Sequence, residues 1–239
     1  MGTEITYLYH SAFAVKTAAH FLIFDYYLDT PHGAGLSAGV INPEELQGTN
    51  PVVFVSHRHP DHFSPRIFSW RSMAPTIRYV LSDDVRTRED AVRLRPGQTA
   101  GFGGLTVQTL RSTDEGVAFL VKTDGLCIYH AGDLNWWKWK EDTPADREEA
   151  GRAYCREIDT LRGERIQLAF VPVDPREGAD ALLGIDYFMR AVGADFVVPM
   201  HSFGDTSFFD ILKTDPRTES YRQKILFYRD RGDKIDLNI

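Results

Sequence analysis

Residues 51–62 read PVVFVSHRHPDH. The apolar run at 51–55 is typical of a strand buried on both faces, and a polar loop follows it directly. Within six positions that loop carries three imidazoles and one carboxylate, from His57, His59, His62 and Asp61. Such groups are costly to dehydrate beside a buried strand, and a metal ion accounts for all four. The alternative is a polar turn whose histidines hydrogen-bond one another, which requires four polar groups to find partners.

The spacing of these groups divides them between two ions. Side chains two positions apart in an extended loop point the same way, so His57 and His59 can bind one ion. The adjacent Asp61 and His62 can turn toward a second ion. We therefore expect one or two divalent ions per chain. Imidazole-rich ligation favours zinc, with manganese or iron as alternatives where carboxylates supply more of the ligands.

Short apolar runs lie on both sides of this loop. Strands are predicted at 5–9, 13–15, 21–24 and 77–81, with a long loop rich in glycine and proline at 31–49. Ser64 and Pro65 form the pattern of an N-cap followed by proline at the first helical position, so a helix is expected to begin there. The metal-binding loop therefore connects a strand to a helix.

The second half of the chain continues with β-structure and then alternates strands with helices. Strands are predicted at 105–110, 117–122, 126–130, 168–173 and 196–199, and Thr123-Asp124-Gly125 suits a hairpin turn between two of them. Helices are predicted at 144–165, capped by Thr143, and at 180–192, closed by Gly193. This order indicates an α/β (α+β) protein with two mixed sheets and helices outside them.

The composition narrows the class of protein. The chain has 239 residues, with 34 acidic and 27 basic side chains and a net charge of -7. Its length suits one domain over 1–239, with two packed halves as the alternative. The negative charge disfavours nucleic acid as a partner. No apolar run approaches the ~18 residues that span a bilayer. The two cysteines lack C-x-x-C spacing, which suits a reducing compartment. We therefore expect a cytoplasmic protein, and we expect its partner to be a small-molecule substrate. A homo-oligomer is compatible with these features.

The order of the motifs resembles one known family. His57-Arg58-His59-Pro60-Asp61-His62 matches the H-x-H-x-D-H signature of the metallo-β-lactamase superfamily. Ala131-Gly132-Asp133 resembles the family's G-D segment, whose aspartate bridges the metals. Val198-Pro199-Met200-His201 resembles the late strand that ends in the last histidine ligand. With its Tyr9-His10-Ser11 hairpin, the chain is most similar to metal-dependent hydrolases of the ascorbate-6-phosphate lactonase type.

This resemblance implies a four-layer αββα sandwich with a hydrolytic metal centre. It implies that the first ion is bound by His57 and His59, the second by Asp61, His62 and His201, and that Asp133 bridges the two. The metal would lower the pKa of a bound water and supply hydroxide, while Asp61 orients that water and accepts its proton. The substrate implied is an ester, lactone or phosphoester of a small anionic metabolite.

One window departs from the family pattern. Residues 110–116 read LRSTDEG, where family members usually carry another histidine. The first ion would then be bound more weakly, or Asp114 would substitute as a ligand, or a single ion would be held. Arg111 cannot replace a histidine, because its guanidinium offers no lone pair.

Further side chains lie near the site in the family layout. His10 and His130 are candidates for donors to the metal ligands or for substrate contacts, with ordinary structural hydrogen bonds as the alternative. Asp25 follows a predicted strand and is expected to anchor the metal loop. The tryptophans at 136, 137 and 139 form either an apolar wall over the metals, part of the core or a subunit contact.

Three other functions are compatible with the sequence. A phosphodiesterase or nuclease uses the same ligands but needs a local basic groove. A non-catalytic metal-binding or sensor protein would account for the missing histidine in the middle of the chain. A redox di-iron centre uses similar ligands, although a carboxylate would then be expected in place of one early histidine.

Overall fold

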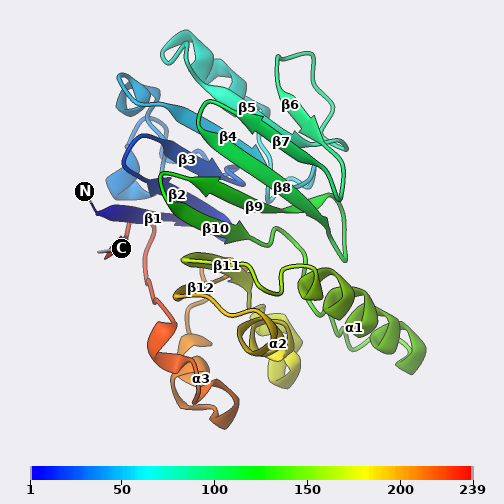
Figure 1. The fold of residues 1–239 in the computed structure, drawn as a ribbon. Helices are drawn as coiled ribbons and strands as arrows, with labels where there is room; N and C mark the ends of the chain where they lie inside the picture. The colour runs from blue at the N-terminus through cyan, green and yellow to red at the C-terminus, as the bar shows by residue number, and fades with distance from the viewer. Residues whose placement is uncertain (1, 238–239) are drawn as a thin grey trace. The chain divides into compact units, whose positions relative to one another are not determined.

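The computed structural model describes residues 2–237 (Figure 1). The described chain divides into two compact units, one formed by residues 2–95 and 228–237 and the other by residues 96–227. Each unit contains one mixed sheet. The first unit is therefore discontinuous in sequence. The expectation of a single domain over 1–239 stays a prediction.

The first unit contains a seven-stranded sheet with the order β13-β1-β2-β3-β4-β5-β6. Its strands are β1 (Thr3–Tyr9), β2 (Ala12–Lys16), β3 (Phe21–Phe24), β4 (Pro51–Val55), β5 (Arg78–Ser82), β6 (Val92–Leu94) and β13 (Lys234–Leu237). Neighbours from β13 to β3 are antiparallel, and those from β3 to β6 are parallel. As predicted, β4 is buried along its whole length. Because Phe24 pairs with Phe54 in parallel register, the chain leaves β3 and β4 at the same edge of the sheet.

Short 3-10 helices occupy the connections of the first unit. They are η1 (Leu36–Ala38), η2 (Pro43–Leu46) and η3 (Pro65–Ser72). The helix expected after Ser64 begins there, and the Ser64 hydroxyl accepts a hydrogen bond from the Arg66 amide at 3.4 Å, but the helix is of the 3-10 type. Ile67 and Trp70 of η3 are buried in one core with Val53 of β4. This packing holds the chain that follows the predicted metal-binding loop against the sheet.

The second unit contains a six-stranded sheet with the order β12-β11-β10-β9-β8-β7. Its strands are β7 (Thr99–Phe102), β8 (Leu105–Arg111), β9 (Val117–Thr123), β10 (Leu126–His130), β11 (Leu168–Pro172) and β12 (Phe196–Met200). Neighbours from β7 to β10 are antiparallel, and those from β10 to β12 are parallel. The predicted hairpin turn between β9 and β10 is present, with φ of 52° at Asp124 and 78° at Gly125. The three parallel strands end at one edge, where the loops after them come together.

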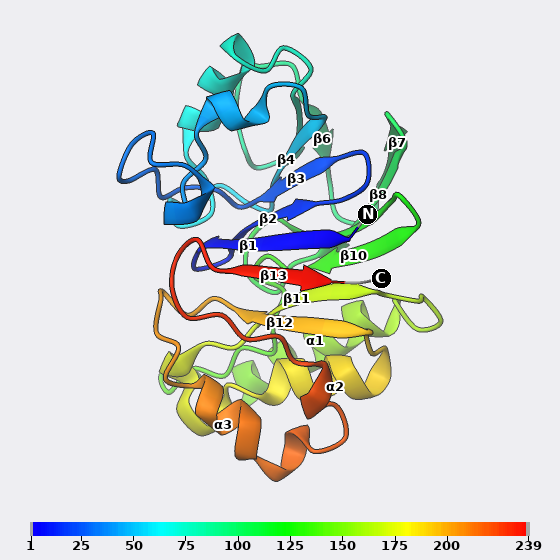
Figure 2. The ribbon, with the colours of Figure 1, turned by 90° about the vertical axis from the view of Figure 1, so that its left-hand side faces the viewer.

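Helices lie along the parallel part of the second sheet. They are α1 (Pro144–Asp159), α2 (Leu183–Ala191) and α3 (Phe209–Thr214), with 3-10 helices η4 (Pro175–Asp180), η5 (Pro216–Thr218) and η6 (Arg222–Lys224). Thr143 caps α1 as expected, in a capping box with Asp146. The α-helix ends at Asp159, earlier than predicted, and Gly193 follows α2 with a φ of 81°. Figures 1 and 2 show the three α-helices on the same side of β11 and β12.

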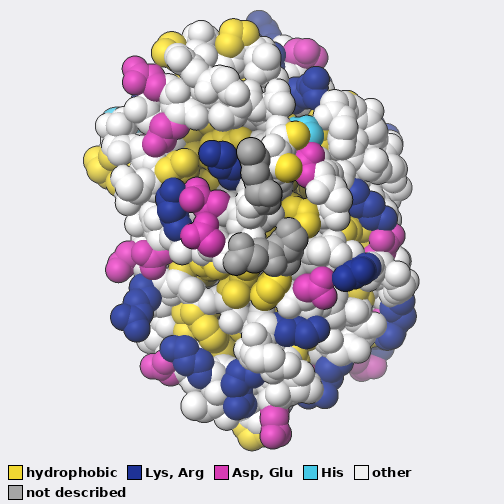
Figure 3. Space-filling view, turned by 60° about the vertical axis from the view of Figure 1, so that its left-hand side comes forward, with side chains coloured by type: hydrophobic (Ala, Val, Ile, Leu, Met, Phe, Trp, Pro, Cys, Tyr) yellow, Lys and Arg dark blue, Asp and Glu magenta, His cyan; other side chains and the backbone are white. Residues whose placement is uncertain are grey.

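The two mixed sheets with helices agree with the predicted fold class, while their stacking into four layers stays a prediction. Among residues 2–237, no helix combines the length and the apolar character needed to cross a membrane. On the face drawn in Figure 3, basic and acidic side chains of the described residues are interspersed. That face therefore carries charges of both signs.

Candidate metal centre

The predicted metal-binding loop leaves the C-terminal end of β4 and turns back on itself. The amides of His62 and Phe63 both donate to the carbonyl of His59, at 3.0 Å. This turn brings the His62 ring to within 4.1 Å of the His57 ring, and the His59 ring lies 4.6 Å from that of His57, measured between centroids. His57 and His62 are fully buried, whereas His59 and Asp61 are partly exposed. The three predicted imidazole ligands are thus adjacent in space.

The buried carboxylate of Asp25 anchors this loop. Asp25 follows β3 and accepts hydrogen bonds from the Ser56 amide at 2.7 Å, the Ser56 hydroxyl at 2.6 Å and His62 Nδ1 at 2.8 Å. Because the Ser56 hydroxyl donates to Asp25, it can accept from His57 Nδ1, which lies 2.9 Å away. Both imidazoles therefore carry their proton on Nδ1 and present the lone pair of Nε2, the arrangement typical of histidines that bind metals.

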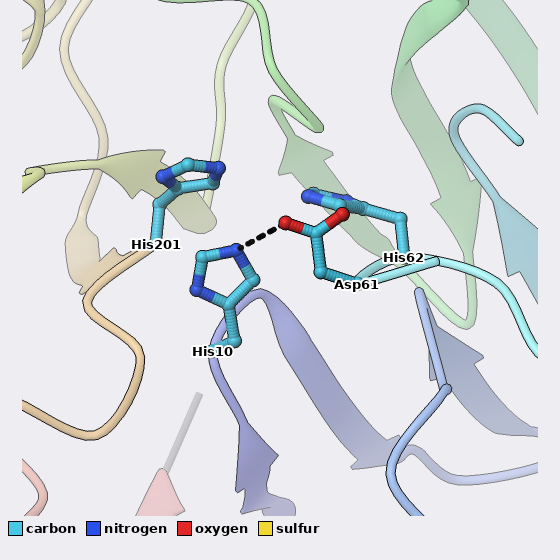
Figure 4. A group of neighbouring side chains, drawn as sticks. All are labelled: His10, Asp61, His62 and His201. Atoms are coloured by element: carbon cyan, nitrogen blue, oxygen red, sulfur yellow. Dashed lines mark ion pairs between the residues drawn. The ribbon is translucent and has the colours of Figure 1, made fainter. Parts of the chain in front are cut away.

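His10 joins Asp61 and His62 at the same end of the first sheet. It lies in the turn between β1 and β2 with a φ of 56°, and its amide donates to the Tyr7 hydroxyl at 2.9 Å. Its Nε2 lies 3.6 Å from Asp61 Oδ2, an ion pair drawn as a dashed line in Figure 4. One ligand atom from each of His10, Asp61 and His62 lies within 4.8 Å of the others. His10 is therefore positioned beside the predicted ligands, as the family layout suggests.

In the second unit, Asp133 and His201 form the corresponding pair. Asp133 follows β10 and His201 follows β12, and both side chains are buried. His201 Nε2 lies 3.3 Å from Asp133 Oδ1. Thr113, in the turn between β8 and β9, fixes the loop after β10, because its hydroxyl contacts the Asp133 and Asn135 carbonyls at 3.3 and 2.7 Å. The sequence-predicted ligands of this unit are thus in contact with each other.

Asp174 orients the His201 ring, as Asp25 orients the His62 ring. It follows β11, and its Oδ2 accepts from His201 Nδ1 at 3.0 Å. Burial raises the pKa of the Asp174 carboxyl, but hydrogen bonds from His201 and Arg176 hold this pKa at about 2. Burial lowers the pKa of His201, but the carboxylates of Asp133 and Asp174 raise it to about 9. Asp174 thus directs Nε2 of His201 toward Asp133.

Asp114 lies where a substitute ligand is needed. Its carboxylate is exposed and has an oxygen within 4.8 Å of a carboxylate oxygen of Asp133. The Asp114 amide donates to the Ser112 hydroxyl at 3.1 Å, which shapes the turn that carries it. The segment at 110–116, which lacks the expected histidine, therefore still offers a group that could bind a metal beside Asp133.

The tryptophan cluster separates into two groups. Trp136 packs against Tyr154 of α1 and Tyr187 of α2, with ring centroids 6.3 and 6.0 Å away, so it belongs to the helix packing. Trp137 lies beside the candidate ligands, because its indole N–H donates to the Asp133 carbonyl at 3.0 Å and its ring is 5.3 Å from that of His201. Trp136 therefore packs among the helices and Trp137 contacts two of the proposed ligands, while an apolar wall over the metals stays a prediction.

Sequence reasoning missed Asp174, Arg176 and Glu177. The first follows a buried parallel strand, as His57 and Asp133 do, and this position was the available signal. Glu177 accepts from the Lys138 amide at 2.7 Å and from the Asn135 side chain at 3.1 Å. Burial raises the pKa of the Glu177 carboxyl to about 7. No local pattern distinguishes Arg176 or Glu177 from surface residues of a charged loop.

Residues 4–143 match the family described as beta-lactamase superfamily domain. The chain belongs to this family. A UPF0173 metal-dependent hydrolase of Rubrobacter xylanophilus is 28% identical over 225 residues, which cover 84% of this chain and 81% of the relative. One from Methanosarcina barkeri is 27% identical over 237 residues, covering 90% and 88%. The metallo hydrolase Igni18 of Ignicoccus hospitalis is similar in structure, with a TM-score of 0.68, 18% identity and full coverage of both chains.

These similarities confirm the metallo-β-lactamase fold and the predicted class, a metal-dependent hydrolase of this superfamily. The donor chemistry fits that class. Each unit offers an imidazole Nε2 oriented by a buried carboxylate and one further carboxylate, which is Asp61 in the first unit and Asp133 in the second. Divalent transition metals prefer donors of these kinds.

Proposed function

We propose that the chain hydrolyses an ester, lactone or phosphoester of a small anionic metabolite. The ligands proposed for one or two ions are His57, His59, Asp61, His62, Asp133 and His201. The observation that carries this proposal is the orientation of the imidazoles, since the Nδ1 atoms of His62 and His201 each lie within 3.0 Å of a buried aspartate oxygen. Such pairing leaves Nε2 of both rings as the ligand atom.

The metal, when bound, would lower the pKa of a water molecule and polarise the substrate's carbonyl or phosphoryl oxygen. In this proposal Asp61 receives the proton of that water on Oδ2. Its position suits the role, because the carboxylate is partly exposed and His10 Nε2 lies 3.6 Å from the same oxygen. His10 can thus steady the Asp61 carboxylate and pass on its proton.

Zinc is the ion that this imidazole-rich set favours. Asp114 enters the proposal as the ligand that replaces the absent histidine, because a carboxylate oxygen of Asp133 lies within 4.8 Å of it. A carboxylate there is harder than an imidazole, so it weakens the preference for zinc relative to manganese or iron. Metal analysis of the purified protein decides among these ions.

The substrate class rests on the resemblance to the ascorbate-6-phosphate lactonase type and on the chain's charge. A net charge of -7 disfavours a long nucleic acid, and the face in Figure 3 mixes charges of both signs. A phosphodiesterase or nuclease remains the second candidate, and it predicts cleavage of bis(p-nitrophenyl) phosphate in preference to esters. A metal-binding or sensor protein predicts bound metal without turnover.

The test combines metal content with turnover in His59→Ala. His59 is partly exposed, so removing its ring should leave the fold intact while it weakens metal binding. We expect metal-loaded wild type to hydrolyse at least one ester, lactone or phosphodiester, and His59→Ala to lose both metal and turnover. His32→Ala is the matched control, because His32 is exposed and belongs to neither group of described side chains that could hold a metal.

Unchanged turnover in a fully loaded His59→Ala variant would contradict the proposed ligand set. Full metal occupancy in wild type with no hydrolysis across the panel would contradict the hydrolase and favour the sensor. Circular dichroism of each variant separates loss of metal from loss of fold.

A further inference from the structure

Five side chains of the second unit contact one another in a closed ring, which we call the His201 collar. Its members are His201, Trp137, Trp139, Arg176 and Phe203. The His201 and Trp137 rings are 5.3 Å apart, and Trp137 stacks on Trp139 at 5.2 Å. The Arg176 guanidinium carbon lies 5.3 Å from the Trp139 ring centre and 5.0 Å from that of Phe203. Phe203 closes the ring at 5.9 Å from His201.

The cation of this collar is held in a fixed position relative to His201. Arg176 Nε lies 2.9 Å from Asp174 Oδ1, and its Nη2 lies 2.5 Å from Asp174 Oδ2. The same Oδ2 accepts from His201 Nδ1 at 3.0 Å. One buried carboxylate therefore binds both the proposed ligand histidine and the guanidinium, so a positive charge is fixed beside His201.

Arg176 differs from Asp174 in its access to solvent. The Asp174 side chain is 1% exposed, whereas that of Arg176 is 55% exposed. The planar fork of a guanidinium suits carboxylate and phosphate groups. Phe203, also in the collar, is 40% exposed. The collar thus presents a charged donor and an apolar ring together.

We propose that Arg176 binds the anionic group, a carboxylate or phosphate, of the small molecule hydrolysed at the metal centre. Trp139 and Phe203 hold the guanidinium by cation–π contacts and offer apolar surface to the rest of the molecule. This inference rests on the proposed function, and it names the substrate class of that site. In the alternative role, Arg176 only neutralises Asp174 and affects all substrates equally through His201.

The first experiment measures the Kd of inorganic phosphate by calorimetry on metal-loaded wild type, Arg176→Ala and Arg176→Lys, with metal content determined for each. Loss of a charged hydrogen bond should weaken phosphate binding roughly tenfold or more in Arg176→Ala at equal metal content. Arg176→Lys keeps the charge without the fork, so an intermediate Kd is expected, and this variant decides the result if Arg176→Ala does not fold. The matched control is Arg152→Ala, which removes an exposed arginine of α1.

The second experiment compares two p-nitrophenyl esters that share a leaving group, the neutral acetate and the anionic hydrogen succinate. We expect Arg176→Ala to reduce kcat/KM roughly tenfold more for the succinate ester than for the acetate ester, with the extra loss mainly in KM. Equal losses for both esters, or a phosphate Kd that does not change, would overturn the proposal. Absence of all turnover in wild type would contradict the proposed function alone, since the phosphate titration tests Arg176 without hydrolysis.

Discussion

At the scale of single residues, two buried aspartates have the same task in the two units. Asp25 accepts from His62 Nδ1 and from Ser56, and Asp174 accepts from His201 Nδ1. Both carboxylates are fully buried, so their hydrogen bonds are not weakened by water. The imidazoles are therefore oriented within the folded chain, which reduces the conformational entropy that metal binding has to remove.

Asp25→Asn tests this orientation in the first unit. The amide group brings a donor against the donors of Ser56 and His62, so the rings lose their fixed tautomer and position. We expect the affinity for zinc to fall by about 10–100-fold, measured by competition with a chromogenic chelator. Asp83→Asn, at an exposed carboxylate near the end of β5, should bind zinc like wild type. Wild-type affinity in a folded Asp25→Asn variant would show that Asp25 does not orient the ligands.

At the scale of elements, the loop after β10 is fixed from two sides. Thr113 approaches it from the turn between β8 and β9, and Glu177 of η4 accepts from the Lys138 amide and the Asn135 side chain. Asp133 lies at the start of this loop. The buried carboxyl group of Glu177, whose pKa is raised to about 7, thus supports the loop that carries the proposed metal ligand Asp133.

Glu177 makes stability depend on pH in a defined window. Its pKa is raised from 4.5 to about 7 in the folded chain, so between these values the folded state binds more protons than the unfolded state. The unfolding free energy should therefore fall as the pH rises from 4.5 to 7, by roughly 2–3 kcal/mol from this group. Urea denaturation of chelator-treated wild type and Glu177→Gln measures the difference. The variant should resemble wild type at the acidic end and exceed it in stability at the neutral end, whereas parallel curves would refute the assignment.

At the scale of the whole molecule, the last segment of the described chain passes back from the second unit and completes the first. Residues from 228 onward rejoin it, β13 pairs with β1, and Tyr228 stacks on Tyr7 with ring centroids 3.9 Å apart. The Arg231 guanidinium donates to carbonyls of three separate stretches of this unit, at Leu8, Leu28, Thr30 and Gly39. One side chain from the end of the described chain thus fixes the loop at 28–39 against β1.

Arg231→Ala should loosen this closure. Loss of the hydrogen bonds from a charged, partly buried group is expected to lower the unfolding free energy by about 2–3 kcal/mol. Hydrogen exchange should quicken in residues 28–39, while exchange in β10 to β12 stays as in wild type. Arg229→Ala is the control, because Arg229 is exposed. If hydrogen exchange became faster to the same extent in both units, this result would contradict a local role for Arg231.

Short sequence patterns were sufficient to predict the features that depend on residues close together in the chain. The buried strand at 51–55, the hairpin at 123–125 and the cap at Thr143 all follow from short-range geometry, and the structure contains each of them. The metallo-β-lactamase fold was implied by the resemblance that three motifs carry. Strand β13 was missed, because its partner β1 lies at the other end of the chain and its four residues carry little pattern of their own.

The sequence by itself determined which side chains are candidate metal ligands, because ligand chemistry and spacing are local properties. Only the tertiary structure decided which partners orient them. Asp25 is 31 residues from Ser56, and Asp174 is 27 residues from His201. The collar likewise joins Trp139, Arg176 and Phe203 from the segments that follow β10, β11 and β12. Such contacts arise because parallel strands bring their C-terminal ends to one edge of a sheet, whatever the length of chain between them.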